Sequence, residues 1–589
     1  MNTTSLYRHG RLVLAGAGLV TIVVTGCDSP VKSRSERELR DAVTRATEQE
    51  LADSPRRDIT LEPAPSDLAE RFQGERLDEL ERMGGPNSYE LVEVMIGEDL
   101  NGLPVQGVRV SLREAVLSAV EHNLGVQIAS VSPSIAESQI AIAESRFDAV
   151  WTGTLNWEKL DQPAVTPVVG GVPVSAGVSA RESVNFTTGI EKRLISGGTA
   201  QIATGVSRVD NQAPGVTSFP DPSYLSNIQI GLTQPLLEGF GSEVALAEIR
   251  LERNSTRSEI EEFRNALIET VQRTEAAYWN LVLARQALRI RERLLDRGSE
   301  TRDKLIARED YDVESAQISD ALTRVQTREV DVLRARTEVL RASDELKQLM
   351  NAPELSVGSE MMIVPTDAAP TDPMTFNLVD AILTGVRRRP EIRQALLSID
   401  DASIRQMLAD NLRLPRLDLT MQTQFTGLDG ELGDSYGNAT DDQFVSYLVG
   451  LSVEQPIGNR EAEANYRAAR LRRLQSVISY QQVIQLVTRE IKDSLRDVRL
   501  NYDLLVPTRD ARLAAAENLR TIEVKEEFQA ALTPEFLNLK FNRQEALALA
   551  ELEEARAIAE YQISLSNLYA AMGVILDRNQ INFVVPEFE

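Results

Sequence analysis

Two kinds of hydrophobic periodicity alternate along this chain. The segments at 228–233, 417–423 and 449–454 alternate apolar with small or polar residues, the period of two expected of a β-strand with two different faces. Over 242–306 and 312–350, Gly and Pro are nearly absent and apolar residues recur at steps of three and four. The pattern therefore predicts short strands joined to very long helices.

The long helices carry the pattern of a coiled coil. The apolar stripe on the second of them consists of Ile318, Leu322, Val325, Val332, Val339, Ala342, Leu346 and Leu349. A recurrence of seven residues predicts packing with a left-handed twist. About sixty helical residues would span roughly 90 Å, more than a bilayer needs, so such a helix would project away from a membrane. Polar breaks at 307–310 and 531–534 predict that the chain turns back at each.

The chain contains two copies of one sequence pattern of helices and strands. SLREAVLSAVEHN, which begins at Ser111, matches NLVDAILTGVRRR, which begins at Asn377, in pattern more than in identity. In both copies a helix breaks, at Asn123-Leu124 or Arg389-Pro390, and a second helix leads into alternation. Such self-similarity indicates internal duplication. We expect a first repeat at 106–360 and a second at 361–589.

The alternating segments have the length of transmembrane β-strands, each roughly ten residues. A half-buried strand of a soluble sheet would show the same alternation of apolar and polar residues. However, the sequence offers no other apolar layer to cover these segments. The four strands of the two copies cannot close a barrel, and unpaired edges in hydrocarbon cost several kcal/mol per backbone group. The sequence thus predicts an oligomer. An extra hairpin at about 183–208, with Gly197-Gly198 near its turn, either enlarges the barrel or forms an external loop.

The N-terminus has the features of a secreted lipoprotein. Arg8 and Arg11 precede the short apolar run LVLAGAGLVTIVVTG, and Val-Thr-Gly-Cys follows the pattern of a lipobox. We expect a signal peptide at 1–26, a lipidated Cys27, and a lipid-anchored tether at 27–105 that is rich in charge, Pro and Gly. Asp28 resembles a residue that retains some bacterial lipoproteins in the inner membrane, so the lipid alone does not fix the membrane.

Composition excludes several function classes. The formal charge of −26, with basic residues interspersed among acidic ones, argues against nucleic-acid binding. One cysteine and two histidines, His9 and His122, offer little for a metal site or a catalytic triad, and no phosphate-binding loop occurs. We expect no enzyme, no cofactor and no metal.

Both copies change from strand to helix at a Gln-Pro pair. Gln234-Pro235 lies in GLTQPLLEGFG and Gln455-Pro456 in VEQPIGN, and Pro suits the end of a strand or the first turn of a helix. With the opening helix SLREAVLSAVEHN, the helix AAYWNLVLARQAL, the turn REDYDVESAQ and the closing YQISLSNLYAAMG, these exits resemble the TolC family of bacterial outer-membrane efflux proteins from about Val108 onwards.

This resemblance implies a mainly α protein with β-strands, built from two tandem repeats. It implies a homotrimer whose strands form one outer-membrane β-barrel and whose helices continue as a long periplasmic coiled-coil barrel closed at its far tip. Its partners would be outer-membrane lipid, a periplasmic adaptor and an inner-membrane pump, in efflux or in type I secretion. The chain would be a passive duct.

The resemblance also implies an acidic constriction near the turns. YDVESAQ places Asp312 at a matching acidic position, beside Glu309, Asp310 and Glu314. The second turn, LTPEFLNLKF, departs from the pattern and leaves Glu535 as its nearby carboxylate. Either copies of Asp310 and Asp312 gather into a cation-favouring gate, or these acids are solvated helix-start residues favoured by the helix dipole.

An alternative function from another class fits part of the sequence. A lipid-anchored structural coiled coil in the periplasm would use Cys27 and the long helices. It would leave the duplicated strands, with their polar alternate faces, without a role.

Overall fold

The computed structural model describes residues 97–310 and 313–586, apart from short gaps at 164, 166–167, 174–177, 214–217, 442 and 529–532, and some stretches nearer the N-terminus, chiefly 57–62 and 74–85. The chain forms two compact units. One contains Ile135–Thr256 and Leu397–Ile478, and the other contains Val43–Ser134, Arg257–Leu396 and Ser479–Glu589. The predicted signal peptide and Cys27 lie outside the described residues.

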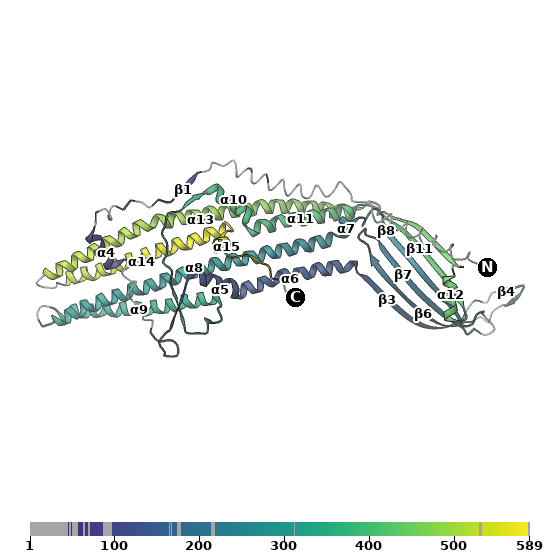
Figure 1. The fold of residues 1–589 in the computed structure, drawn as a ribbon, viewed down its shortest axis with the longest axis horizontal. Helices are drawn as coiled ribbons and strands as arrows, with labels where there is room; N and C mark the ends of the chain where they lie inside the picture. The colour runs from purple at the N-terminus through teal and green to yellow at the C-terminus, as the bar shows by residue number, and fades with distance from the viewer. Residues whose placement is uncertain are drawn as a thin grey trace, which may run out of the picture. The chain divides into compact units, whose positions relative to one another are not determined.

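The first unit is built on one antiparallel sheet of six strands in the order β12-β11-β8-β7-β6-β3 (Figure 1). The strands are β3 (Ala149–Pro163), β6 (Val178–Arg193), β7 (Thr199–Asn211), β8 (Ser223–Pro235), β11 (Arg416–Asp429) and β12 (Val445–Glu454). The extra hairpin of the sequence is β6 and β7, and it lies inside the sheet between β3 and β8. A two-stranded extension, β4 (Val168–Val169) with β5 (Val172–Pro173), and the helix α12 (Leu432–Thr440) complete this unit.

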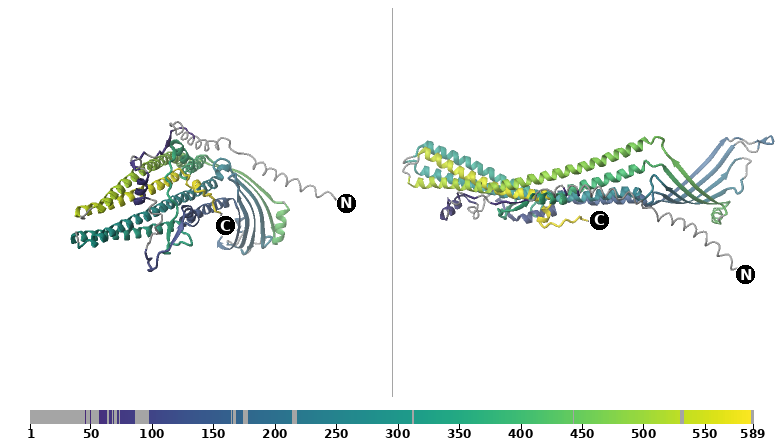
Figure 2. Two further views of the ribbon diagram at one scale, coloured as in Figure 1. Left: turned by 60° about the vertical axis from the view of Figure 1, so that its left-hand side comes forward. Right: turned by 90° about the horizontal axis from the view of Figure 1, so that it is seen from above.

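Cross-strand register keeps the alternation in phase across the sheet. Directly paired residues share a face, because side chains alternate along every strand. The apolar pairs are Trp151 with Ile190, Ile190 with Ile202, Ile202 with Ile230, Leu232 with Met421, and Met421 with Val449. One face of the whole sheet is therefore mainly apolar and the other mainly polar. Figure 2 shows that the sheet curves.

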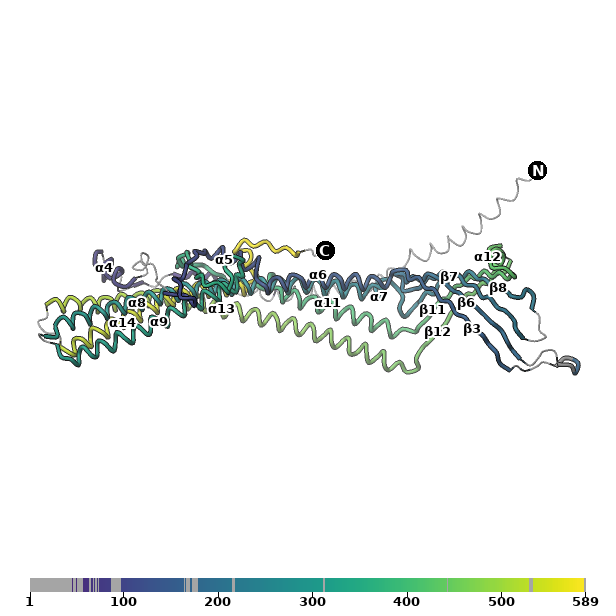
Figure 3. The backbone as a smooth tube through the Cα atoms, turned by 90° about the horizontal axis from the view of Figure 1, so that it is seen from below, coloured from purple at the N-terminus to yellow at the C-terminus, as the bar shows by residue number. Residues whose placement is uncertain are grey.

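The long helices lie where the sequence predicted, with ends that differ by up to three residues. The helices of the first repeat are α5 (Leu112–His122), α6 (Leu124–Glu144), α7 (Ser242–Ala245), α8 (Ala247–Ala307) and α9 (Ser315–Met350). Those of the second repeat are α10 (Leu378–Arg388), α11 (Pro390–Asn411), α13 (Arg460–Phe528), α14 (Pro534–Ala571) and α15 (Ile575–Arg578). Ser111 and Glu114 form a capping box at the start of α5, and Asn377 caps α10. In the second unit α8 lies beside α9 and α13 beside α14, so each pair is a helical hairpin (Figures 1 and 3).

The buried seam of α9 has the spacing of a coiled coil. Its buried residues are Ala321, Val325, Arg328, Val332, Ala335, Val339, Ser343, Leu346, Lys347 and Met350. Four of the eight predicted apolar positions are buried members of this seam, whereas Leu322 is 42% exposed. Apolar residues at steps of three and four predict a helix. They do not decide which of two neighbouring apolar positions faces the partner helix. The seam also contains charged side chains that the apolar pattern could not indicate.

The described part of the expected tether packs on the second unit. Helix α4 (Glu75–Gly84) buries Leu80 against Leu513, Leu519 and Leu547. Strand β1 (Asp58–Thr60) of the tether pairs with β10 (Thr375–Asn377), and β2 (Gly107–Val110), at the start of the first repeat, pairs with β9 (Met362–Pro365). Helix α4 is amphipathic, and its apolar side packs against helices of the same unit.

Among the residues that the structure describes, no helix is both long and apolar enough to cross a bilayer.

Candidate channel wall and helix turns

The apolar face of the sheet is strongly exposed in the single chain. Its most exposed large side chains are Trp151, Leu155, Trp157, Ile190, Ile202, Ile230, Tyr447, Val449, Leu451 and Val453. Trp151 is 72% exposed and Val449 is 73% exposed. A contiguous apolar surface of this kind marks a partner or a membrane, because water disfavours it.

The opposite face is lined by small and uncharged polar side chains over most of its length. Its central members are Thr152, Asn156, Asn185, Thr187, Gln201, Ser207, Asn227, Gln229, Thr420, Gln422, Gln424 and Ser446. Some of them are joined, for example by the 2.6 Å hydrogen bond that the Ser207 hydroxyl donates to Asn185 Oδ1. Ten to sixteen residues per strand, apolar on one side and polar on the other, is the arrangement of a membrane barrel with a wet lumen.

Gln234, at the first strand exit, holds the turn of the extra hairpin. Its side chain is buried, and its Nε2 donates to the Ser196 carbonyl at 3.0 Å while its Oε1 accepts from the Ser196 hydroxyl at 2.6 Å. The Gly241 amide donates to the same carbonyl. Gly197 has φ +90°, and a Cβ there would lie 2.1 Å from the Gly239 carbonyl oxygen, so only glycine suits this contact.

Asn411, the last residue of α11, fixes the loop after Pro235. Its Oδ1 accepts from the Gly239 amide at 2.7 Å, and its Nδ2 donates to the Leu237 carbonyl at 3.4 Å. Sequence reasoning missed Asn411, because the residue stands 172 positions from Gly239.

The second strand exit is different. Gln455 and Pro456 are exposed, and the Gln455 amide donates to the neighbouring Pro456 carbonyl at 3.4 Å. The structure thus places both predicted exits at strand ends, but only the first is built into a buried contact. The cause is the extra hairpin, which the second repeat lacks.

Replacement of Gln234 by Ala is expected to destabilise the sheet unit by about 1–3 kcal/mol, because it removes the hydrogen bonds that the buried Gln234 side chain forms with the hydroxyl and the carbonyl of Ser196. Replacement of Gln455 by Ala, the matched control, should change stability by less than about 0.5 kcal/mol. The measurement is the thermal unfolding midpoint of the β signal in detergent, by circular dichroism. Equal shifts in the two variants would contradict the assigned role of Gln234.

The predicted gate carboxylates stand at or beside the helix turns. Glu309 and Asp310 follow the end of α8, Glu314 is the N-cap of α9, and Glu535 lies in the first turn of α14. All four are exposed, and Asp312 lies outside the described residues. The Glu314 amide donates to Gln317 Oε1 at 2.9 Å, an arrangement typical of a helix start.

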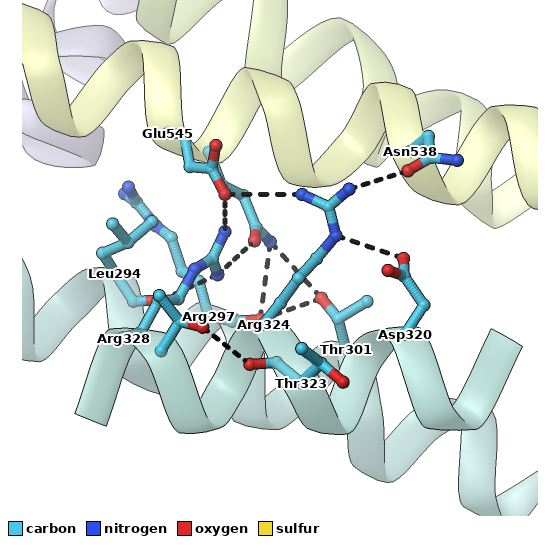
Figure 4. A network of polar contacts seen from close by, with 11 residues as sticks. Leu294, Arg297, Thr301, Asp320, Thr323, Arg324, Arg328, Asn538 and Glu545 are labelled. Carbon is cyan, nitrogen blue, oxygen red and sulfur yellow. Dashed lines mark hydrogen bonds and ion pairs between the residues drawn. The ribbon is translucent and has the colours of Figure 1, made fainter. Parts of the chain in front are cut away.

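A polar network connects the two hairpins close to their turns (Figure 4). Arg328 of α9 is buried, and its Nη1 donates to Gln544 Oε1 of α14 at 2.9 Å and to the Leu294 carbonyl of α8 at 3.0 Å. Glu545 of α14 faces both Arg328, at 3.4 Å, and Arg324, at 3.5 Å. Burial lowers the pKa of Arg328, and Glu545 opposes this shift. The network had no sequence signal beyond an arginine at a seam position.

Beside this network, charged side chains from the end segments of α8, α13 and α14 line an open cavity of about 660 Å³. Lys540 is buried and pairs with Glu526 at 2.7 Å, and Lys304 approaches the same carboxylate at 3.9 Å. Burial raises the pKa of Glu523, which also lines the cavity. Within the described residues, no cluster of three or more His, Cys, Asp or Glu side chains could hold a metal ion.

Comparison with solved structures identifies the fold. No protein-family model and no curated protein sequence matches the chain. The outer-membrane channel OprN matches with a TM-score of 0.55 at 16% identity, over 78% of this chain and 89% of that one. The CmeC outer membrane channel of Campylobacter jejuni matches with 0.55 at 14% identity, over 79% and 86%. The open state of the MtrE outer membrane channel of Neisseria gonorrhoeae matches with 0.55 at 16% identity, over 79% and 89%.

The chain therefore has the fold of these outer-membrane channels. The predicted fold class, mainly helical with a sheet and long paired helices, is confirmed. The motifs had indicated a resemblance to the TolC family, and the structural matches confirm this resemblance at the level of the fold.

Proposed function

We propose that this protein is an outer-membrane exit duct, the passive channel of a tripartite efflux pump or a type I secretion system. The observation that carries the proposal is the six-stranded sheet with one exposed apolar face and one polar face, joined in the same chain to long helical hairpins. The fold shared with outer-membrane channels supports it. Transport through such a duct needs a lumen and a moving gate, and no reactive group.

Three copies would form the working channel, with a periplasmic adaptor and an inner-membrane pump at the far end. A single sheet in the bilayer core would leave the backbone groups of its two edges unpaired. The proposal therefore requires that several copies of the chain assemble. The helix turns, where the two hairpins are joined by polar contacts, would be the end that an adaptor opens.

The chain would be held at the outer membrane by lipid on Cys27 after removal of residues 1–26. Residues 27–105 would connect this anchor to the helices, in line with the packing of α4 on α13 and α14. The two repeats, 106–360 and 361–589, would each supply strands to the barrel and one helical hairpin.

The direct experiment is to reconstitute the detergent-extracted protein in planar bilayers and record single-channel currents. Discrete openings are expected, and their frequency should rise when the turn region is loosened. Extraction without detergent, together with silent bilayers even after the turns are loosened, would favour the structural coiled coil instead.

The acidic turn residues are expected to favour cations in that recording. Neutralising Glu309, Asp310 and Asp312 together as Gln, Asn and Asn should reduce the preference for potassium over chloride, because three copies bring these charges around one pore. Asp303→Asn, a change in an exposed carboxylate on α8 that pairs with Arg302, is the control and should leave selectivity unchanged. Unchanged reversal potentials in the triple variant would show that these acids are ordinary helix-end residues.

A further inference from the structure

The two edge strands of the sheet, β3 and β12, each have one edge available for pairing with a further strand. Within the described residues, no strand pairs with the outer edge of β3 or of β12. Almost every residue of these two strands is exposed, whereas the inner strands β7, β8 and β11 are mostly half-buried. Unpaired edges of this length are costly in lipid and prone to aggregate in water, so each edge requires a partner strand.

We propose that β12 of one copy pairs with β3 of the next, so that three copies close a single barrel of eighteen strands with the β6–β7 hairpin in its wall. The proposal rests on the proposed function for the number of copies. Its new content is the register between neighbouring copies and the inclusion of the extra hairpin in the barrel wall.

The topology fits a closed ring. Six strands that alternate in direction leave β3 and β12 antiparallel to each other. A rotation that places β12 against the β3 of a neighbour therefore continues the antiparallel order. Such head-to-tail contacts close when the rotation completes a circle, and closure leaves no free edge.

Two conditions fix the register across the new contact. The end of β12 leads into α13 and the start of β3 follows α6, so both lie at the end of the sheet that joins the helices. The apolar face must also be continuous, because a slip of one residue would turn every side chain to the wrong side. With these ends level and the faces in phase, the pairs are Val453 with Trp151, Leu451 with Gly153, and Val449 with Leu155 on the apolar side. On the polar side they are Ser452 with Thr152 and Gly450 with Thr154.

The extra hairpin, β6 and β7, is an integral part of the sheet and would therefore form part of the barrel wall. It is hydrogen-bonded to β3 on one side along fifteen residues and to β8 on the other along eleven. Its turn is held by the buried Gln234, and its alternation is in phase with both neighbours. A barrel of eighteen strands has about twice the cross-section of a twelve-stranded barrel, in which each of three copies supplies four strands, because diameter grows with strand number. Barrels of this size enclose water, so the duct would pass large hydrated solutes at the membrane level.

Cysteine pairs test the register in the full-length protein. The variant with Ser452→Cys and Thr152→Cys should oxidise into covalent dimers and closed trimers on non-reducing gels, since directly opposed residues approach to disulfide distance. The matched variant with Ser452→Cys and Gly153→Cys places the two sulfurs on opposite faces and should stay at one chain. The parent, whose single cysteine is Cys27, is the background control.

Electron cryomicroscopy of the purified particle counts the strands. Eighteen strands around one lumen, with the hairpin in the wall, is the expected result. Twelve strands in a trimer with the hairpin outside, a closed particle of two copies, or linkage of the out-of-phase pair would each overturn the proposal. Conductance from a twelve-stranded trimer would leave the proposed duct standing, whereas loss of the duct itself would appear as silent bilayers.

Discussion

Replacement of Arg512 by Ala is expected to cost about 3–5 kcal/mol of folding free energy, the largest effect of any single change considered for this chain. The side chain of Arg512 is 1% exposed and forms ion pairs with Glu554 at 2.5 Å and with Glu81 at 2.8 Å. Its Nη1 also donates to the Gly84 carbonyl at 2.8 Å. Without the guanidinium, the Glu554 carboxylate would be buried without its counter-ion, and α4 would lose its main polar attachment to α13 and α14.

The pH dependence of this loss follows from Glu554. Burial raises the pKa of Glu554 above its ordinary value, and Arg512 opposes that shift. Removing Arg512 therefore raises this pKa further, and the folded variant gains a stronger preference for the protonated acid than the unfolded chain has. Below the ordinary carboxyl pKa, Glu554 is neutral in both states and the loss should be smaller. As the pH rises through the raised pKa, the loss should grow to its full value.

The measurement is the unfolding midpoint of parent and variant at pH 4 and at pH 7.5, with limited proteolysis before α4 as a second readout. Arg509→Ala is the matched control: Arg509 pairs with the same Glu81 at 2.9 Å but is 47% exposed, so the cost should stay below about 1 kcal/mol. The double change Arg512→Met with Glu554→Leu removes both charges and should recover most of the stability. An equal loss in the Arg509 and Arg512 variants would refute the importance of burial here.

Replacement of Arg328 by Ala is expected to cost about 2–4 kcal/mol and to raise the open probability of the reconstituted channel. The change removes the buried donor that the Leu294 carbonyl and the Gln544 amide oxygen share. It also removes the guanidinium that lies 5.3 Å from the Phe541 ring. Because these contacts join α9 of the first hairpin to α8 and α14, their loss should let the hairpin ends separate more easily.

Thermal unfolding and single-channel recording measure the two consequences separately. Arg328→Lys keeps the charge but cannot form the forked contacts, so it should lie between parent and Ala variant in both measurements. Arg334→Ala, on the same helix at a side chain that is 76% exposed, should leave both unchanged. A destabilised Arg328→Ala channel with parental open probability would show that the network supports folding and has no part in gating.

Local chemistry determined the boundaries of the elements. The helix breaks at Asn123 and at Arg389-Pro390 and the strand ends at both Gln-Pro pairs are found where the pattern predicted them. Each depends on residues within a few positions, such as a ring without an amide proton or a capping side chain. The duplication and the two periodicities likewise predicted two repeats in which short strands join very long helices.

What the elements contact was decided by the tertiary structure. Gln234 and Gln455 stand in equivalent local sequences, yet only the first is buried, because the turn at Ser196 and Gly197 folds back over it. In the sequence Arg328 and Arg512 look like ordinary charges on long helices. Their partners Gln544 and Glu81 lie 216 and 431 positions away. Sequence periodicity therefore determined which residues form helix and which form strand. Which charges are enclosed, and whether the extra hairpin joins the sheet, depended on long-range packing, which no local window contains.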